Sequence, residues 1–158
     1  MKLLILVDNK NAIAKDGKQI MFVDNDLDMF KNYTTNNIIV MGRKTLDDIG
    51  RQLPNRISVV FTRSEKEDKE DLFYIDSVEK LDKIIEAYPD KEVFVIGGAE
   101  IVKLLWDRID ELIVTRVDTV VQGADTFIPD FDAFKLIDKM EIEDESYKVY
   151  HEKWVREK

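Results

Sequence analysis

Short, mainly apolar runs recur along the chain and alternate with segments of helical periodicity. The runs are rich in β-branched and aromatic residues and lie at 2–7, 37–41, 57–61, 72–75 and 92–96. Apolar runs without polar alternation are typical of strands that are covered on both faces. Helices are predicted over 24–34, 44–50, 77–88 and 99–109, the third with Ser77 as its cap. This alternation predicts an α/β fold with a largely parallel sheet, and 158 residues suit one domain spanning 1–158.

The C-terminal third has a different pattern. The run 111–121 is longer and becomes alternating near its end. The segments 134–142 and 147–155 also alternate, and we expect them to pair with each other as antiparallel strands. The predicted sheet therefore gains antiparallel strands at its C-terminal side.

Charge and composition exclude several classes of partner. Lys and Arg number 24 and Asp and Glu 33, so the net charge is −9, which repels nucleic acid and anionic lipid. With no Cys and a single His, a metal site is not expected. The first apolar run is too short for a signal sequence or a membrane span. We therefore expect a cytoplasmic protein without nucleic-acid or membrane partners. We also expect a monomer, because no segment of the sequence reads as an oligomer interface.

Three predicted strands end in residues suited to an anion. The first end is "MGRKT", the second is "FTRS", and the third is "VIGGAEI", in which two glycines precede a helix. Carboxyl ends of parallel strands lie at one edge of a sheet, where ligands gather. On an acidic protein, a phosphate site must be built from such local cations and backbone N–H groups. The three ends together indicate an extended site for a ligand with several phosphates.

Asp26 is the candidate reactive carboxylate. It lies at the start of a predicted helix, so an N-cap is one interpretation, and Asp24 and Asp28 are alternatives for either role. The other interpretation is a carboxylate in an apolar cleft, whose proton affinity is raised by loss of water. His151 lies in an alternating polar strand, where we expect a surface or packing role.

The chain resembles dihydrofolate reductases over nearly its whole length. The matching segments occur in the family's order: "DLDMFK", "VMGRKTLDDIGRQLPNR", "FTRS", "VIGGAEI", "LIVTRVD" and "GADTFIPDF". The resemblance implies three layers, with a mostly parallel eight-stranded sheet, an antiparallel C-terminal strand and about four flanking helices. It also implies that NADPH lies across the strand ends.

The resemblance assigns the cofactor residues by position. Arg43 and Arg63 would bind the 2′-phosphate, since arginine forks suit phosphate. Lys44 and Thr45 would serve the pyrophosphate, and the Gly97–Gly98 bond resembles the family's cis peptide. The remaining cofactor positions implied by the match are Leu6, Ile13, Gly42, Thr62, Ser64, Ile96, Gly97, Gly98, Ala99 and Ile101.

On the substrate side, the resemblance places Asp26 at the family's pterin-binding carboxylate. Thr115 would join its hydrogen bonds, and Arg56 would hold the α-carboxylate of the glutamate tail. The apolar walls would be Ile5, Leu27, Phe30, Ile49 and Leu53. The implied reaction transfers hydride from NADPH to C6 of dihydrofolate, with protonation at N5.

Several positions around the reacting rings depart from the family pattern. Met21 replaces a Trp, Asp24 a frequent Pro, Ala14 a Gly, Leu6 a small residue, and Val102 a frequent Tyr. Three alternatives follow: a reductase of the same fold with another substrate, such as the pyrimidine reductase of riboflavin synthesis, a non-catalytic binder of NADPH or folate, and a structural protein. The retained ionic positions argue against the last.

Overall fold

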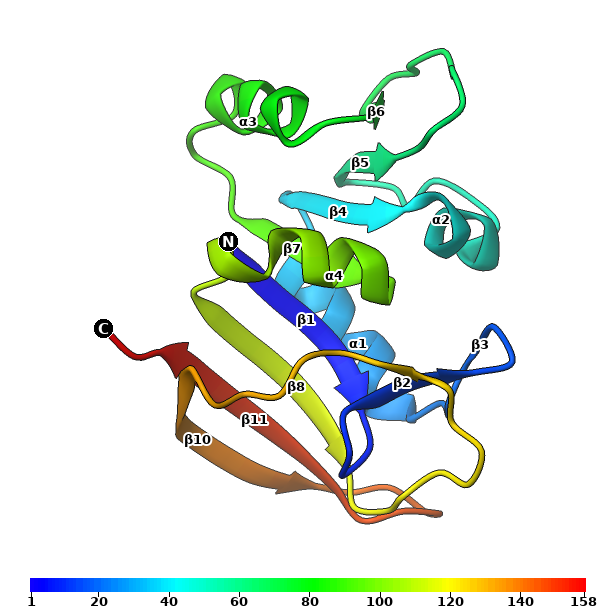
Figure 1. Cartoon of the computed structure of the whole chain (residues 1–158), viewed down its shortest axis with the longest axis vertical. Helices are drawn as coiled ribbons and strands as arrows, with labels where there is room; N and C mark the ends of the chain where they lie inside the picture. The colour runs from blue at the N-terminus through cyan, green and yellow to red at the C-terminus, as the bar shows by residue number, and fades with distance from the viewer.

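A central eight-stranded sheet organises the computed structural model, which describes all of residues 1–158 (Figure 1). Its strands are ordered β10-β11-β8-β1-β7-β4-β5-β6. The six strands from β8 to β6 are mutually parallel, β11 runs antiparallel to β8, and β10 pairs antiparallel with β11. The strand bounds are β1 Lys2–Val7, β4 Ile38–Gly42, β5 Ile57–Phe61, β6 Leu72–Ile75, β7 Val93–Gly97, β8 Glu111–Val117, β10 Phe134–Ile142 and β11 Val149–Arg156. The predicted α/β class and the antiparallel C-terminal hairpin are confirmed.

Four helices cover the sheet, and they begin and end for local reasons. They are α1 Asp24–Thr34, α2 Arg43–Ile49, α3 Val78–Ala87 and α4 Ala99–Leu105, which continues as the 3₁₀ turn η1 Trp106–Arg108. Ser77 accepts a hydrogen bond from the Lys80 amide at 3.3 Å and so caps α3, as predicted. Gly50 ends α2 in the left-handed conformation, with φ of 82°.

Alternate residues of each central strand enter different cores, which makes the fold three-layered. Leu3 and Val7 of β1 belong to the cluster that includes Leu81 of α3 and Leu105 of α4. Leu4 lies on the other face, in the cluster against which residues of α1 and α2 pack. In Figure 1, α4 lies in front of the sheet and α1 behind it.

A small second sheet was not predicted from the sequence. It consists of β2 Ala12–Lys15, β3 Lys18–Gln19 and β9 Thr126–Phe127, in the order β3-β2-β9. The turn of its hairpin is Asp16–Gly17, with φ of 51° and 77°. Asp-Gly is the preferred pair for a two-residue hairpin turn, so a usable sequence feature was present. The hairpin lies beyond the carboxyl end of β1 (Figure 1).

Three predicted boundaries are wrong. Strand β8 ends at Val117 rather than at residue 121, because its pairing with β1 and β11 ends there. The amide of Val121 instead donates to Asp8 Oδ2 at 2.9 Å. Helix α4 ends at Leu105 and tightens into η1, and the N-cap of α1 is Val23, without a side-chain hydrogen bond, rather than an Asp.

Candidate active site at the carboxyl ends of the parallel strands

Asp26 and Thr115 form a hydrogen-bonded pair of side chains. Asp26 lies in the first turn of α1, and Thr115 is fully buried on β8. Thr115 Oγ1 donates to Asp26 Oδ1 at 2.6 Å. The N-cap interpretation of Asp26 is therefore wrong, since Val23 holds that position. Burial raises the pKa of Asp26 above its ordinary value, while the Thr115 hydrogen bond and the charge of His151 act in the opposite direction.

The raised pKa predicts that Asp26 opposes folding when it is ionised. A folded-state pKa above the unfolded value means that stability falls as the pH rises through the interval between the two values. Asp26→Asn removes the charge and keeps an oxygen that can accept from Thr115. We expect a higher Tm than wild type at neutral pH, and a gain that vanishes in acid below the unfolded pKa. Calorimetry at neutral and acid pH measures this, and an unchanged or lower Tm at neutral pH would contradict it.

The predicted apolar walls divide between the two faces of the sheet. Phe30, Ile49 and Leu53 are partly buried and pack on the cluster of the α1 face. Leu27, next to Asp26, leaves 71% of its surface exposed. Ile5 packs against the cluster on the α4 face, because successive strand residues point to opposite sides. The structure thus brings together the α1-face walls and Asp26, while the Ile5 side chain lies across the sheet.

Arg56 is held at the other end of the α1 face. Only 8% of it is exposed. Its Nε donates to Thr34 Oγ1 at 2.9 Å and its Nη1 to the Pro54 carbonyl at 2.8 Å, while its guanidinium lies over the Phe30 ring at 5.9 Å. Burial lowers the pKa of Arg56 from its ordinary value. Its Nη2 group donates to no protein atom, so the arginine is fixed in place with donors to spare.

Gly97 and Gly98, at the end of β7, lie beside Thr45, and Gly42, at the end of β4, lies beside Gly98 and Ile101. A Cβ added to Gly97 or Gly98 would lie 3.8 or 3.9 Å from Thr45 Oγ1. A Cβ on Gly42 would lie 3.2 Å from Ile101 Cγ1. The Gly97–Gly98 peptide bond is cis, as the resemblance implied, and the φ of Gly97 is 125°, which side-chain-bearing residues rarely adopt. The ends of β4 and β7 therefore form a cradle lined by backbone, which side chains would fill.

Arg43 and Lys44 stand beside this cradle, and both are paired with acids. Arg43 Nε lies 3.2 Å from Asp47 Oδ1, and Lys44 Nζ lies 3.1 Å from Asp48 Oδ2. Lys44 Nζ also donates to the Gly17 carbonyl at 2.7 Å. Exposed i,i+4 pairs of this kind contribute only about 0.3–0.5 kcal/mol. Both cations can therefore exchange their carboxylates for a phosphate at small cost.

Thr62, Arg63 and Ser64 of "FTRS" line a hollow at the end of β5. The hollow has a volume of about 450 Å³. Thr62 Oγ1 accepts from the Ser64 amide at 3.2 Å, and Arg63 is exposed and forms no ion pair. Lys66 and Lys80 also line it, and sequence reasoning missed both. Lys66 lies in the run of mixed charges after "FTRS", and Lys80 comes from α3. The Phe61–Gly42 pairing of β5 with β4 sets this hollow beside the end of "MGRKT".

Two departures from the family pattern pack together. Leu6 belongs to a small cluster with Val23, and Met21 packs against that cluster. Compared with the family pattern, β1 thus carries a larger side chain at Leu6 and the following loop a smaller one at Met21, and both pack in the same cluster. Val102, another of the departures, is fully buried in the α4-face core.

The hairpin carrying Ile13 and Ala14 is tied to Asp125, which lies in the "GADTFIPDF" segment. The Asp16 amide donates to Asp125 Oδ2 at 2.9 Å, and the Asp125 amide donates to the Ala14 carbonyl at 3.1 Å. The hydrogen bond from the Asp16 amide, and after it the one from the Thr126 hydroxyl, lower the pKa of Asp125. With the Lys44–Gly17 bond, the hairpin is fastened on two sides.

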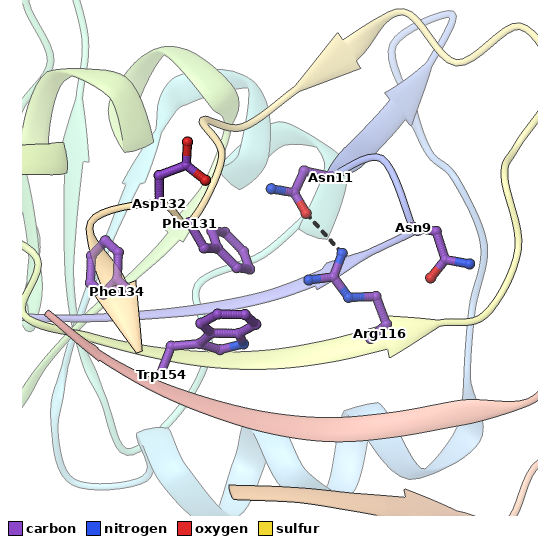
Figure 2. A pocket seen from close by; sticks show the side chains of 7 residues that line it. All are labelled: Asn9, Asn11, Arg116, Phe131, Asp132, Phe134 and Trp154. Atoms are coloured by element: carbon purple, nitrogen blue, oxygen red, sulfur yellow. Dashed lines mark hydrogen bonds between the residues drawn. The ribbon is translucent and has the colours of Figure 1, made fainter. Parts of the chain in front are cut away.

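A second hollow, of about 580 Å³, lies on the α4 face of the sheet (Figure 2). Arg116 projects into it and donates to Asn11 Oδ1 at 2.8 Å and to the Asp8 carbonyl at 2.7 Å. Glu152, 5% exposed, pairs with Arg116 at 3.2 Å. The arginine is thus fully engaged by protein groups, and the cluster ties β8 and β11 to the loop after β1. No predicted site residue lies there.

No helix is long and apolar enough to span a membrane, and no group of three or more potential ligands could hold a metal ion.

Comparisons with known proteins agree with this geometry. The dihydrofolate reductase family model matches residues 1–156. The chain is 32% identical to the dihydrofolate reductase of Staphylococcus haemolyticus over 137 residues, covering 85% of this chain and 81% of that protein. It is 34% identical to that of Haemophilus influenzae over 127 residues, covering 80% and 77%. The structure of a dihydrofolate reductase from Enterococcus faecalis, complexed with NADP(H) and RAB-propyl, superposes with a TM-score of 0.85 at 30% identity, covering 99% of this chain and 96% of that one. This chain therefore belongs to the dihydrofolate reductase family.

Proposed function

We propose that the chain reduces 7,8-dihydrofolate to 5,6,7,8-tetrahydrofolate with NADPH, and that Asp26 binds the pterin ring. The observation that carries the assignment is the Asp26–Thr115 pair, at 2.6 Å. Asp26 Oδ1 accepts from Thr115, while Oδ2 accepts no hydrogen bond from the protein. An ionised carboxylate has about four acceptor sites, so this one can still accept from two ring donors.

Asp26 acts by binding and orienting the substrate. Its carboxylate accepts from the amino group and N3 of the pterin, and Thr115 fixes the carboxylate's orientation. Leu27 and Phe30 wall the ring, and exclusion of water strengthens the ionic hydrogen bonds. NADPH, when bound, supplies the hydride that adds to C6. Solvent delivers the proton to N5, because Asp26 contacts the edge of the pterin that carries N3 and the amino group, away from N5.

Arg56 is the proposed contact for the α-carboxylate of the glutamate tail. Its bonds to Thr34 and Pro54 leave Nη2 available for a carboxylate oxygen. Ile49 and Leu53, on the α1 face, would line the path between the ring and the tail. Ile5 would contribute through its backbone position at the end of β1 rather than as a side-chain wall on the α1 face.

The cofactor would lie across the ends of β1, β7, β4 and β5. Arg43 and Arg63 would bind the 2′-phosphate. The glycine cradle admits the close approach of a pyrophosphate to the backbone, which a Cβ would block. The other proposed contacts are Leu6 and Ile13 near the nicotinamide, Gly42, Lys44, Thr45, Ile96, Gly97, Gly98, Ala99 and Ile101 along the pyrophosphate, and Thr62 and Ser64 at the adenosine.

The test is NADPH consumption by the purified protein. We expect loss of NADPH absorbance only when dihydrofolate is also present, and inhibition by a folate antagonist. Calorimetric titration with NADPH separates the alternatives, since a non-catalytic binder would bind the cofactor and show no turnover. A rate indistinguishable from the enzyme-free blank at high protein concentration would reject the proposed activity.

We also propose that residues 1–158 act as one domain and one molecule. The edge strand β10 carries Lys135, Asp138, Lys139 and Glu141, and charges on an edge oppose pairing with another sheet. We expect one cooperative unfolding transition and a mass in solution near 18.5 kDa. Light scattering that gave twice this mass would contradict the monomer. The proposed compartment is the cytoplasm, since a chain without Cys needs no oxidising environment, and fractionation of the source cells tests this.

A further inference from the structure

The only histidine of the chain lies beside the Asp26–Thr115 pair. Strand β11 runs antiparallel to β8, and His151 is directly opposite Thr115. Side chains of directly opposite residues share a face of the sheet, with their Cβ atoms about 4.5–5.5 Å apart. Thr115 uses that face to donate to Asp26. His151, Thr115 and Asp26 therefore form a row that runs from β11 across β8 to α1.

One ring nitrogen of His151 is unsatisfied in this position. Its Nε2 atom is buried and has no hydrogen-bond partner. Buried polar side-chain atoms are nearly always bonded, so an exception calls for an explanation. Its other neighbouring strand presents Met140, which cannot serve as a strong partner.

Few other charges face His151. On β8, the neighbours on this face are Ile113 and Val117, both apolar and buried. Helix α1 contributes Asp26 from its first turn and the uncharged side chain of Tyr33 from its last turn.

The two outer strands contribute the remaining charges. On β11 itself the next residue on the face is Lys153, which lies over the Tyr33 ring at 6.0 Å. On β10, Asp138 is opposite Lys153. Glu152 points to the other face, where it pairs with Arg116.

Asp26 is the charged group that acts on His151. Burial lowers the pKa of His151 and the Asp26 charge raises it, while the His151 charge in turn lowers the pKa of Asp26. Burial thus moves the two pKa values toward each other, whereas the attraction between the two groups moves them apart. When two groups interact in this way, their titration belongs to the pair.

We propose that His151 is a positioning residue that acts electrostatically on the substrate-binding carboxylate Asp26, with Thr115 between them. The protonated imidazole favours the ionised carboxylate, and so keeps Asp26 able to accept from the pterin ring as the solution becomes acidic. The consequence is that substrate binding extends to lower pH than it would with a neutral residue at position 151. This role rests on the proposed binding function of Asp26, whereas the interaction of the two groups does not.

The interaction is measured by NMR, without substrate. Because the chain has one histidine, its ring proton resonance is assigned without ambiguity. We expect the midpoint of the His151 titration to move to lower pH in Asp26→Asn, since an attractive charge is lost. Asp28→Asn, an equal charge change at an exposed position of the same helix, is the control and should leave the midpoint near that of wild type. Equal midpoints in wild type and Asp26→Asn, or a resonance that does not titrate in either, would overturn the proposal.

The functional consequence is measured by the pH profile of kcat/KM for dihydrofolate. His151→Gln keeps polarity and removes the charge. We expect its acid limb to move to higher pH, with a loss of about tenfold at a pH one unit below the wild-type midpoint and less than about threefold at neutral pH. His151→Lys, which keeps a cation, should restore the acid limb, and Lys153→Gln should not move it. An acid limb unchanged in His151→Gln would overturn the role in binding. Absence of all activity in wild type would reject the proposed function, while the NMR result would still decide the interaction.

Discussion

Asp26→Asn is expected to lower kcat/KM for dihydrofolate by roughly 10²- to 10⁴-fold at neutral pH. The carboxylate would accept two hydrogen bonds from the pterin, and bonds to charged groups contribute about 1.5–3 kcal/mol each. Asn keeps the shape and an oxygen for Thr115, so the loss reports charge and acceptor capacity rather than packing. The same substitution is expected to stabilise the unliganded protein, so lost activity with a raised Tm would exclude misfolding as the cause.

The pH dependence of this loss has a definite sign. In wild type, kcat/KM should fall as the pH falls through the raised pKa of Asp26, because the protonated acid accepts fewer hydrogen bonds. In Asp26→Asn this acid limb should disappear. Steady-state rates from acid to neutral pH measure both effects, with Asp28→Asn as the matched control. A variant whose rates stay within about threefold of wild type across this range would rule out the anchoring role.

Arg63→Ala is expected to raise KM for NADPH by roughly 10- to 100-fold and to change KM for NADH by less than about threefold. Arg63 is exposed and makes no ion pair within the protein, so its removal should not disturb the fold. Truncation of an arginine that binds a phosphate costs about 1.5–3 kcal/mol of binding free energy. NADH has no 2′-phosphate, so its binding should not depend on Arg63. The expected result is therefore a loss of discrimination between the two cofactors.

The control for Arg63→Ala is Arg108→Ala. Arg108 is also exposed, lies in η1 and pairs with Asp82 at 2.7 Å, far along the chain from the strand-end motifs. It should leave both KM values near wild type. Equal losses for NADPH and NADH in Arg63→Ala would contradict the assignment of Arg63 to the 2′-phosphate.

The sheet could be predicted from the sequence because its strands are buried on both faces. Residues such as Ile38 and Val59 are fully buried, and each central strand is a continuous apolar run of few residues. The β2–β3–β9 sheet escaped prediction because its strands have two to four residues and lie partly exposed. Only its Asp16–Gly17 turn carried a clear pattern.

The candidate site divides in the same way. The strand-end groups around Gly42, Arg63 and Gly97 were found because each follows an apolar run directly. Contacts between distant segments could not be found from spacing. Arg116 meets Glu152 across 36 positions, and Thr115 meets Asp26 across 89.

The departures at Leu6 and Met21 also needed coordinates. Taken singly, each changes the wall around the reacting rings. In the fold they pack on one cluster, so a gain in volume on β1 accompanies a loss in the loop. The cluster at the start of α1 therefore stays apolar although the family's indole is absent.

The central claim is that this chain carries out the reduction despite these departures. Transfer of deuterium from deuterated NADPH to the folate product tests it most directly, because the label reports bond formation at C6. We expect tetrahydrofolate that carries one deuterium at C6, formed in proportion to the NADPH consumed, and its loss in Asp26→Asn. NADPH binding without labelled tetrahydrofolate, at any protein concentration, would contradict the account and leave the chain as a cofactor binder.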